Sequence, residues 1–142
     1  MAILLRDLYK ETKSTYGLDL IAGEEGLDNL MNWVYISEDP GTLEFLHGGE
    51  LIITTGVLCG NEYWLYNFIK GLIEHKTCGL IINIGGHLNR SDISDRIRML
   101  CDRKHYPLFL MPCLRFLSWQ RLIIIIRLWI RSQFDPNVIC VY

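Results

Sequence analysis

The sequence has few charged residues, few prolines and no long apolar segment. Charged residues make up 21% of the 142 residues, apolar residues make up 50%, and 4 residues are proline. This balance excludes an intrinsically disordered chain, because such chains are rich in charge and poor in apolar residues. The apolar run at residues 122–126 is bounded by Arg121 and Arg127 and is far shorter than the ~20 residues needed to cross a bilayer. We therefore expect one folded domain that does not enter a membrane.

Positive charge is scarce in most of the chain. Residues 1–112 carry ten Lys and Arg against fifteen Asp and Glu, whereas residues 113–142 carry four Arg against Asp135 alone. An acidic surface repels the phosphates of nucleic acids. We therefore divide the chain into an acidic body at residues 1–112 and a basic, apolar tail at residues 113–142, and expect no direct nucleic-acid binding.

Signals for metal binding and secretion are missing too. The five cysteines are an odd number and include no CxxC pair and no Cys/His cluster at zinc-ligand spacing, which favours reduced thiols over a metal site. The first apolar residues run directly into Arg6 and Asp7, without the charged start and apolar stretch of a signal peptide. These observations predict a cytoplasmic protein.

The common catalytic motifs are also lacking. The chain has no GxGxxG after a predicted strand, no GxxxxGK[ST], no GxSxG and no HExxH. Cys59 follows a predicted strand, but no histidine or cation is placed near it by the sequence. The histidines stand singly, at His47, His75, His87 and His105. We expect no enzymatic activity and no cofactor.

What the chain does contain is a regular alternation of strand and helix patterns. Apolar or β-branched runs predict strands at residues 30–37, 50–54, 79–84 and 108–111. Helix patterns fall between them, from Asp39 to Gly48 or Gly49, over residues 61–76, and from near Ser91 to Lys104. A short helix before Gly17 and an extended segment at residues 18–22 precede them. This order predicts an α/β fold with a mostly parallel sheet of about four to five strands and crossover helices.

The tail is harder to interpret. Residues 114–133 could form a helix, but the run at residues 123–126 would make it apolar on every side. Such a helix must be buried or must find a partner. It would then pack under the sheet or form a homodimer, and the alternative is a disordered or aberrant tail.

A ligand site is expected where the parallel strands end. Ligands of open parallel sheets bind outside the carboxyl ends of the strands, where loop N–H groups and helix N-termini meet. The candidate ligand-binding residues at these ends are Ser37, Glu38, Thr54, Thr55, Gly56, Gly85 and Gly86. Such groups suit a polar or anionic small molecule. The alternative is that these glycines only form strand-to-helix turns.

Five sequence blocks carry a family resemblance. They are AG at residues 22–23, WVYISED at 33–39, FLHGGELIITTG at 45–56, FIKGLIEHKTCGLIINIGG at 68–86 and YPLFLMP at 106–112. With these blocks the chain resembles the N-terminal domain of the purine-catabolism regulator (PucR) family of bacterial transcription regulators. The resemblance implies a metabolite-sensing domain at residues 1–112, placed ahead of a GGDEF-like region and a helix-turn-helix in the parent regulators. The sheet also looks like the UDP-sugar-binding N-terminal domain of Mur ligases.

Three functions follow as hypotheses. The first is a regulatory domain that senses a small polar metabolite, purine-related or an organic acid, within an expected homodimer. The second is a dimerisation domain without a ligand, formed through the apolar tail. The third is a nucleotide-sugar-binding domain, which rests on the Mur ligase likeness alone.

Overall fold

The apolar runs predicted as parallel strands form one central sheet. The computed structural model describes residues 3–112 and 118–134. Its five-stranded sheet has the order β2-β7-β6-β5-β4. The strands are β2 (Asp19–Ala22), β4 (Trp33–Ile36), β5 (Glu50–Thr54), β6 (Gly79–Ile84) and β7 (Leu108–Pro112). Strands β4, β5, β6 and β7 run parallel to one another, and β2 runs antiparallel to β7. The predicted α/β fold with a mostly parallel sheet is confirmed.

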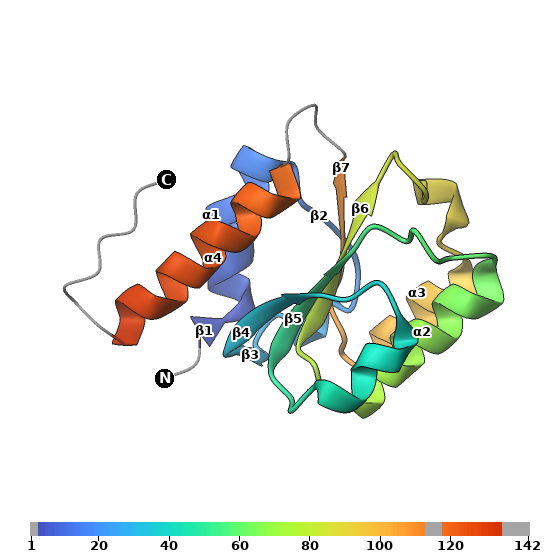
Figure 1. The fold of residues 1–142 in the computed structure, drawn as a ribbon, viewed down its shortest axis with the longest axis horizontal. Coiled ribbons are helices and arrows are strands. Elements are labelled where there is room, and N and C mark those ends of the chain that lie inside the picture. Colours follow the sequence, from blue (N-terminus) through green and yellow to red (C-terminus); the bar gives the residue numbers. More distant parts are fainter. Residues whose placement is uncertain (1–2, 113–117, 135–142) are drawn as a thin grey trace.

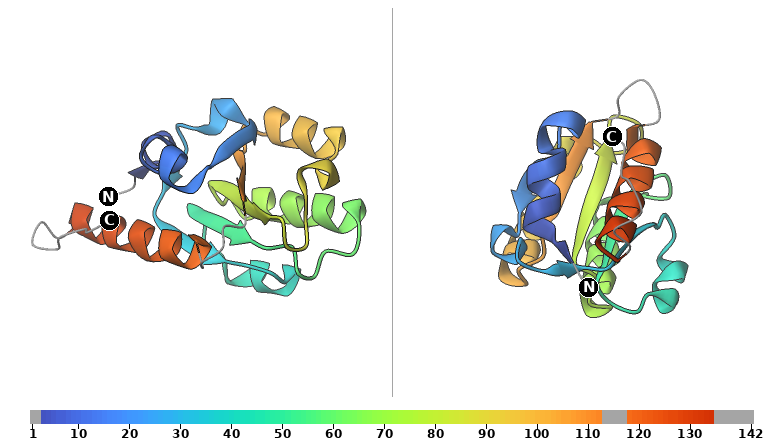
Figure 2. Two further views of the ribbon diagram at one scale, coloured as in Figure 1. Left: turned by 90° about the horizontal axis from the view of Figure 1, so that it is seen from above. Right: turned by 90° about the vertical axis from the view of Figure 1, so that its left-hand side faces the viewer.

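Helices cover both faces of this sheet (Figures 1 and 2). Helices α1 (Leu5–Tyr16) and α4 (Ser118–Phe134) lie on one face, and α2 (Glu62–Glu74) and α3 (Asp95–Arg103) lie on the other. Successive side chains of a strand point to opposite faces. Ile53 and Ile81 accordingly belong to the apolar cluster under α1 and α4, whereas Ile52 belongs to the cluster under α2 and α3. The sheet is thus the middle layer of three.

Polar caps determine where the helices begin. Asn61 precedes α2 and its side chain accepts a hydrogen bond from the backbone N–H of Trp64 at 2.9 Å. Ser94 precedes α3 and accepts from the N–H of Ile97 at 3.3 Å. These caps satisfy N–H groups that have no partner within a helix. Both helices therefore start at the carboxyl edge of the sheet, where the candidate residues lie.

Two predicted elements are shorter than expected. The strand predicted at residues 30–37 is divided at Asn32, because β3 (Leu30–Met31) pairs antiparallel with β1 (Ile3–Leu4) in a separate two-stranded sheet. The following helix is a single 3-10 segment, η2 (Pro40–Phe45), which begins where the Asp39 carboxylate accepts the N–H of Gly41 at 2.9 Å.

The third predicted helix also starts later than expected. A 3-10 turn, η3 (Arg90–Asp92), precedes α3 in place of its first turn. The Asp92 carboxylate caps this turn by accepting the N–H of Asn89 at 2.7 Å. Because Asp92 caps η3 and Ser94 caps α3, the chain forms two short elements there. The remaining 3-10 turn, η1 (Glu24–Gly26), follows β2.

Within the tail, the structure has a helix, α4, which packs under the sheet. Leu122, Ile123, Ile126 and Ile130 are buried in the same cluster as residues of β4 and β5. Ile124 points away and is 58% exposed. Most of the apolar run is therefore covered within the chain. In the described ranges no helix combines the length and the apolar content that a bilayer crossing requires.

Candidate functional site

One cavity collects several of the predicted site residues at the carboxyl edge of the sheet. It has a volume of about 380 Å³, and we refer to it as the strand-end cavity. The described residues that line it are Ile36, Glu38, Thr55, Val57, Asn83, Gly86 and His87. Glu38, Thr55 and Gly86 were predicted as site residues. These come from the ends of β4, β5 and β6, which are neighbours in the sheet.

Strand register explains why these residues meet. Ile36 of β4 lies beside Ile53 of β5, and Thr54 lies beside Ile82 of β6. Glu38 and Thr55 follow Ile36 and Ile53 by two residues each. Because side chains alternate between faces, Glu38 and Thr55 lie on the same face of the sheet as that pair. That face is the one covered by α1 and α4, because residues of the same alternation, such as Ile53, belong to that apolar cluster. The cavity therefore opens at the carboxyl edge on this face.

The Glu38 carboxylate binds the loop that follows β5. Its Oε1 accepts the backbone N–H of Thr55 at 2.7 Å, and its Oε2 accepts the Thr54 hydroxyl at 3.2 Å and the N–H of Val57 at 3.4 Å. Glu38 is half-buried and still lines the cavity. Its side chain therefore fixes the loop and presents a carboxylate to the cavity.

The other predicted residues do not line this cavity. Ser37 is buried and its hydroxyl lies 2.7 Å from that of Thr42. Thr54 is fully buried, and its Oγ1 accepts the N–H of Gly56 at 3.3 Å. Gly85 donates its N–H to the carbonyl of Leu88 at 2.8 Å. These residues shape the turns, as the alternative interpretation of the strand ends allowed.

Four lining residues were not predicted: Ile36, Val57, Asn83 and His87. Asn83 carried a signal, because it is the one polar residue in the strand GLIINI. Asn83 is 4% exposed and lines the cavity, and a side-chain amide carries both N–H donors and a carbonyl acceptor. Asn83 thus offers both a donor and an acceptor to a ligand.

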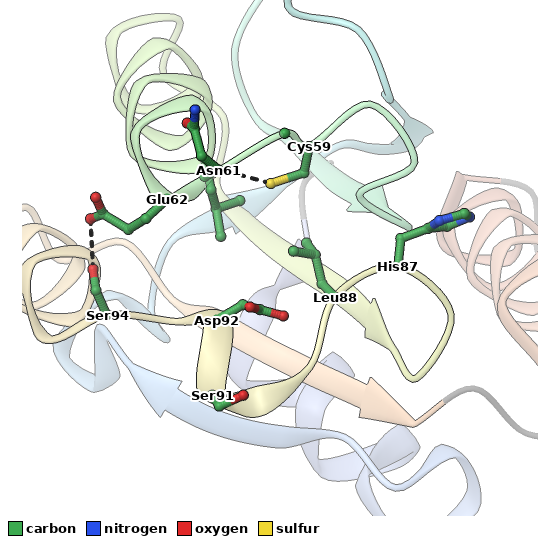
Figure 3. Close-up of a pocket in the computed structure, with 10 residues that line it drawn as sticks. Cys59, Asn61, Glu62, His87, Leu88, Ser91, Asp92 and Ser94 are labelled. Carbon is green, nitrogen blue, oxygen red and sulfur yellow. Dashed lines mark hydrogen bonds between the residues drawn. The ribbon is translucent and has the colours of Figure 1, made fainter.

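A second cavity lies at the same edge on the opposite face, between the starts of α2 and α3 (Figure 3). It has a volume of about 370 Å³ and includes Cys59, Glu62, His87 and Ser94 among its lining. Glu62 accepts the Ser94 hydroxyl at 2.8 Å, so the two helix starts are joined. Burial raises the pKa of the Cys59 thiol, which leaves it less nucleophilic. His87 borders both cavities.

A third cavity, of about 530 Å³, lies at the opposite, amino edge of the sheet. Lys76, Lys104 and His105 are among its lining residues and follow the ends of α2 and α3. Lys76 and His105 have positive backbone φ angles of 61° and 53°, a conformation that residues other than glycine rarely adopt. No predicted site residue lies at this edge.

The described residues contain no arrangement typical of catalysis. His75 contacts the carbonyl of Gly71 at 2.8 Å, and His105 lies 3.0 Å from the Glu25 carboxylate. In the part of the chain that the structure describes, no three His, Cys, Asp or Glu residues are grouped to hold a metal ion. The strand-end cavity therefore offers hydrogen-bonding groups and apolar walls for binding.

The fold is similar to that of a known regulatory region. A structure of the CBS and DRTGG domains of the regulatory region of Clostridium perfringens pyrophosphatase, complexed with its activator diadenosine tetraphosphate, superposes with a TM-score of 0.57 at 19% identity. The match covers 84% of this chain and 48% of that one, so this chain spans about half its length. At this identity the likeness concerns the fold alone, and the Mur ligase likeness stays a prediction.

Sequence comparison gives the family. No curated protein matches the chain significantly. A family model, described as the purine catabolism regulatory protein-like family, matches residues 7–121. The match includes every block quoted above and extends into α4. The chain therefore belongs to the purine catabolism regulatory protein-like (PucR) family.

Proposed function

We propose that this chain is a small-molecule-sensing regulatory domain of a transcription regulator, and that its ligand binds in the strand-end cavity. The observation that carries the proposal is the meeting of Glu38, Thr55 and Asn83 from three neighbouring strands around a volume of about 380 Å³. This volume lies within the range of small-molecule sites. Sites of parallel sheets are also found at this edge.

Two further observations support a sensor. The family name describes a regulatory protein of purine catabolism, so a purine-related compound or an organic acid is the ligand class to test first. The regulatory region of similar fold was solved with a nucleotide activator, which supports a small-molecule ligand for a domain of this fold. We infer that the chain acts by binding, without catalysis or a cofactor, in the cytoplasm.

The charge of the body supports a division of labour within the parent regulator. Residues 1–112 carry an excess of acidic groups, which disfavours contact with DNA phosphates. DNA binding would then fall to another part of the regulator, and ligand binding to the strand-end cavity. Direct nucleic-acid binding by this chain is not expected.

A thermal-shift screen of the whole chain tests the proposal. The compounds are purines and their breakdown products, small organic acids, amino acids and UDP-sugars. A ligand that binds only the folded state stabilises it by about 2.7 kcal/mol at 100 times its Kd. We expect one chemical class to raise the melting temperature. The proposal is wrong if no class does so.

Two isosteric variants locate the site of the effect. Thr55→Val removes a hydroxyl from the cavity wall and keeps the side-chain volume, so we expect it to reduce the shift. Thr15→Val makes the same change at an exposed position of α1 and should leave the shift intact. An equal loss in both variants would place the ligand elsewhere.

A further inference from the structure

Two backbone N–H groups that could attract an anion at the strand-end cavity, in the loop after β5, are already bound. N–H groups in the loop after a parallel strand form concavities that bind phosphates and carboxylates. Here the N–H groups of Thr55 and Val57 both donate to the Glu38 carboxylate, at 2.7 and 3.4 Å. The side chain of Glu38 therefore occupies the position of an anionic ligand group.

Apart from His87, the described lining residues include no side chain that can carry a positive charge. Among the described lining residues there is no lysine or arginine. An anionic ligand would lie beside the Glu38 carboxylate, and like charges at short range in a partly buried site repel strongly. An anion could reach the N–H groups of Thr55 and Val57 only if Glu38 left the loop, with the loss of three hydrogen bonds.

The same lining suits a different ligand chemistry. A carboxylate has about four lone-pair positions, and Glu38 uses three of them within the chain. One position remains for a ligand N–H, and the Asn83 amide adds a donor and an acceptor. Ile36 and Val57 supply apolar walls, and both are partly exposed. An N–H group would thus meet an acceptor, and a flat apolar body would meet the walls.

We propose that the strand-end cavity selects uncharged or cationic ligands that carry N–H donors on a flat apolar body, and that Glu38 excludes anions. This inference rests on the proposed function, because it concerns the same cavity. It narrows the ligand class by removing organic acids and phosphorylated compounds from the expected set.

Three probes of one shape test the selection by charge. Benzamidine, benzamide and benzoate share a flat ring and differ in whether the head group is cationic, neutral or anionic. Each is titrated to millimolar concentration into the ¹⁵N-labelled whole chain, and the amide signals of Thr55, Val57 and Asn83 are followed. We expect benzamidine and benzamide to shift these signals and benzoate to bind about tenfold more weakly or worse, as loss of a charge-assisted hydrogen bond implies.

The outcomes separate this inference from the proposed function. Benzoate binding in the cavity as tightly as benzamide overturns the selection by charge and leaves the cavity as a ligand site. Failure of all three probes to shift these signals contradicts both. Both claims are also contradicted if benzamidine and benzamide shift only the signals of residues outside the cavity.

A pair of charge-neutralising variants adds a control. Glu38→Gln removes the charge and keeps an oxygen that can accept the N–H of Thr55. We therefore expect this variant to bind benzoate more tightly and benzamidine more weakly than the original chain does. Glu74→Gln makes the same change at an exposed position in the last turn of α2, outside the cavity lining. It should change neither affinity. Equal effects of the two variants on probe affinity would overturn the role of Glu38. If Glu38→Gln does not fold, the comparison of the three probes on the original chain decides whether the cavity selects ligands by charge.

Discussion

Two glycines at the strand ends differ in the space around them. Gly56 has a φ of +75°, and a Cβ added to it would lie 2.3 Å from Leu88 Cδ1. Gly86 has no heavy atom within 4 Å of an added Cβ, and it lines the strand-end cavity. Gly56 is thus required by the turn, whereas Gly86 leaves open space beside the cavity.

Alanine substitutions distinguish these two roles. Gly56→Ala should lower the free energy of unfolding by about 1–3 kcal/mol, because it combines a strained φ with overpacking against Leu88. Gly86→Ala should change it by less than about 0.5 kcal/mol, since it meets no neighbour. Urea denaturation measures both. If Gly56→Ala leaves the free energy of unfolding unchanged, the loop that carries Leu88 must move to make room for the added methyl group.

Burial also controls the thiols. Burial raises the pKa of Cys101 to about 12 and also raises that of Cys78, whereas Cys59 is half-buried. The thiolate is the reactive form. We expect iodoacetamide at pH 8 to modify Cys59 well before Cys78 and Cys101 in the folded chain, as peptide mass spectrometry would measure. Equal rates would contradict the burial of Cys78 before β6 and of Cys101 in α3.

These raised pKa values also predict how stability depends on pH. Below the ordinary thiol pKa of about 8.5, Cys78 and Cys101 are neutral in both the folded and the unfolded chain. Above it the unfolded thiols lose protons and the folded ones do not, so the free energy of unfolding should decrease as the pH rises toward the folded values. Replacing Cys78 and Cys101 by serine should remove the part of this decrease in the free energy of unfolding that the two thiols cause.

Sequence reasoning identified the strand ends but not the face on which the cavity opens. Thr54 and Thr55 are adjacent, and both were predicted as ligand-binding residues. Their side chains point to opposite faces, so Thr54 is fully buried while Thr55 lines the cavity. Which face stays open depends on how the helices pack at that edge, and no local pattern determines this.

At the scale of elements, helix α4 carries part of the core. The sequence predicted a helix that must be covered but left open whether the sheet or a second chain covers it. The structure places Leu122 and Ile126 against the sheet, with 0% exposure for both. The predicted boundary at residue 112 stays a prediction, although α4 shares the apolar cluster of the body.

A pair of substitutions tests the packing of α4. Ile126→Ala removes a fully buried side chain and should lower the free energy of unfolding by about 2–5 kcal/mol. Ile124→Ala removes a side chain that is 58% exposed and should have a much smaller effect. Urea denaturation of both variants measures the difference. Similar effects would mean that α4 does not lie on the sheet in solution.

The strand divided at Asn32 shows a limit of pattern reading. Residues 30–37 have the composition of one strand, and only the pairing of β3 with β1 near the start of the chain divides them. That pairing joins residues about 28 positions apart, such as Ile3 and Met31. The contact is set by tertiary structure, which overrides local propensity.

At the scale of the whole molecule, the homodimer stays a prediction. The observation behind it was the apolar run at residues 122–126, and all of that run except Ile124 is buried or half-buried within the chain. A dimer formed through the buried residues of this run would require α4 to leave the sheet, whereas Ile124 is exposed to a partner with α4 in place. Sedimentation at increasing protein concentration tests it, and a dimer that survives Ile124→Glu would need another surface.

The central claim about this domain is that its ligand binds in the strand-end cavity. The decisive measurement is the ¹⁵N spectrum of the whole chain titrated with the compound that raises its melting temperature most. We predict that the largest changes fall on the backbone amides of Thr55, Val57, Asn83 and Gly86. Changes confined to Lys76, Thr77 and Lys104 at the amino edge, or to Glu62 and Ser94 in the second cavity, would contradict it.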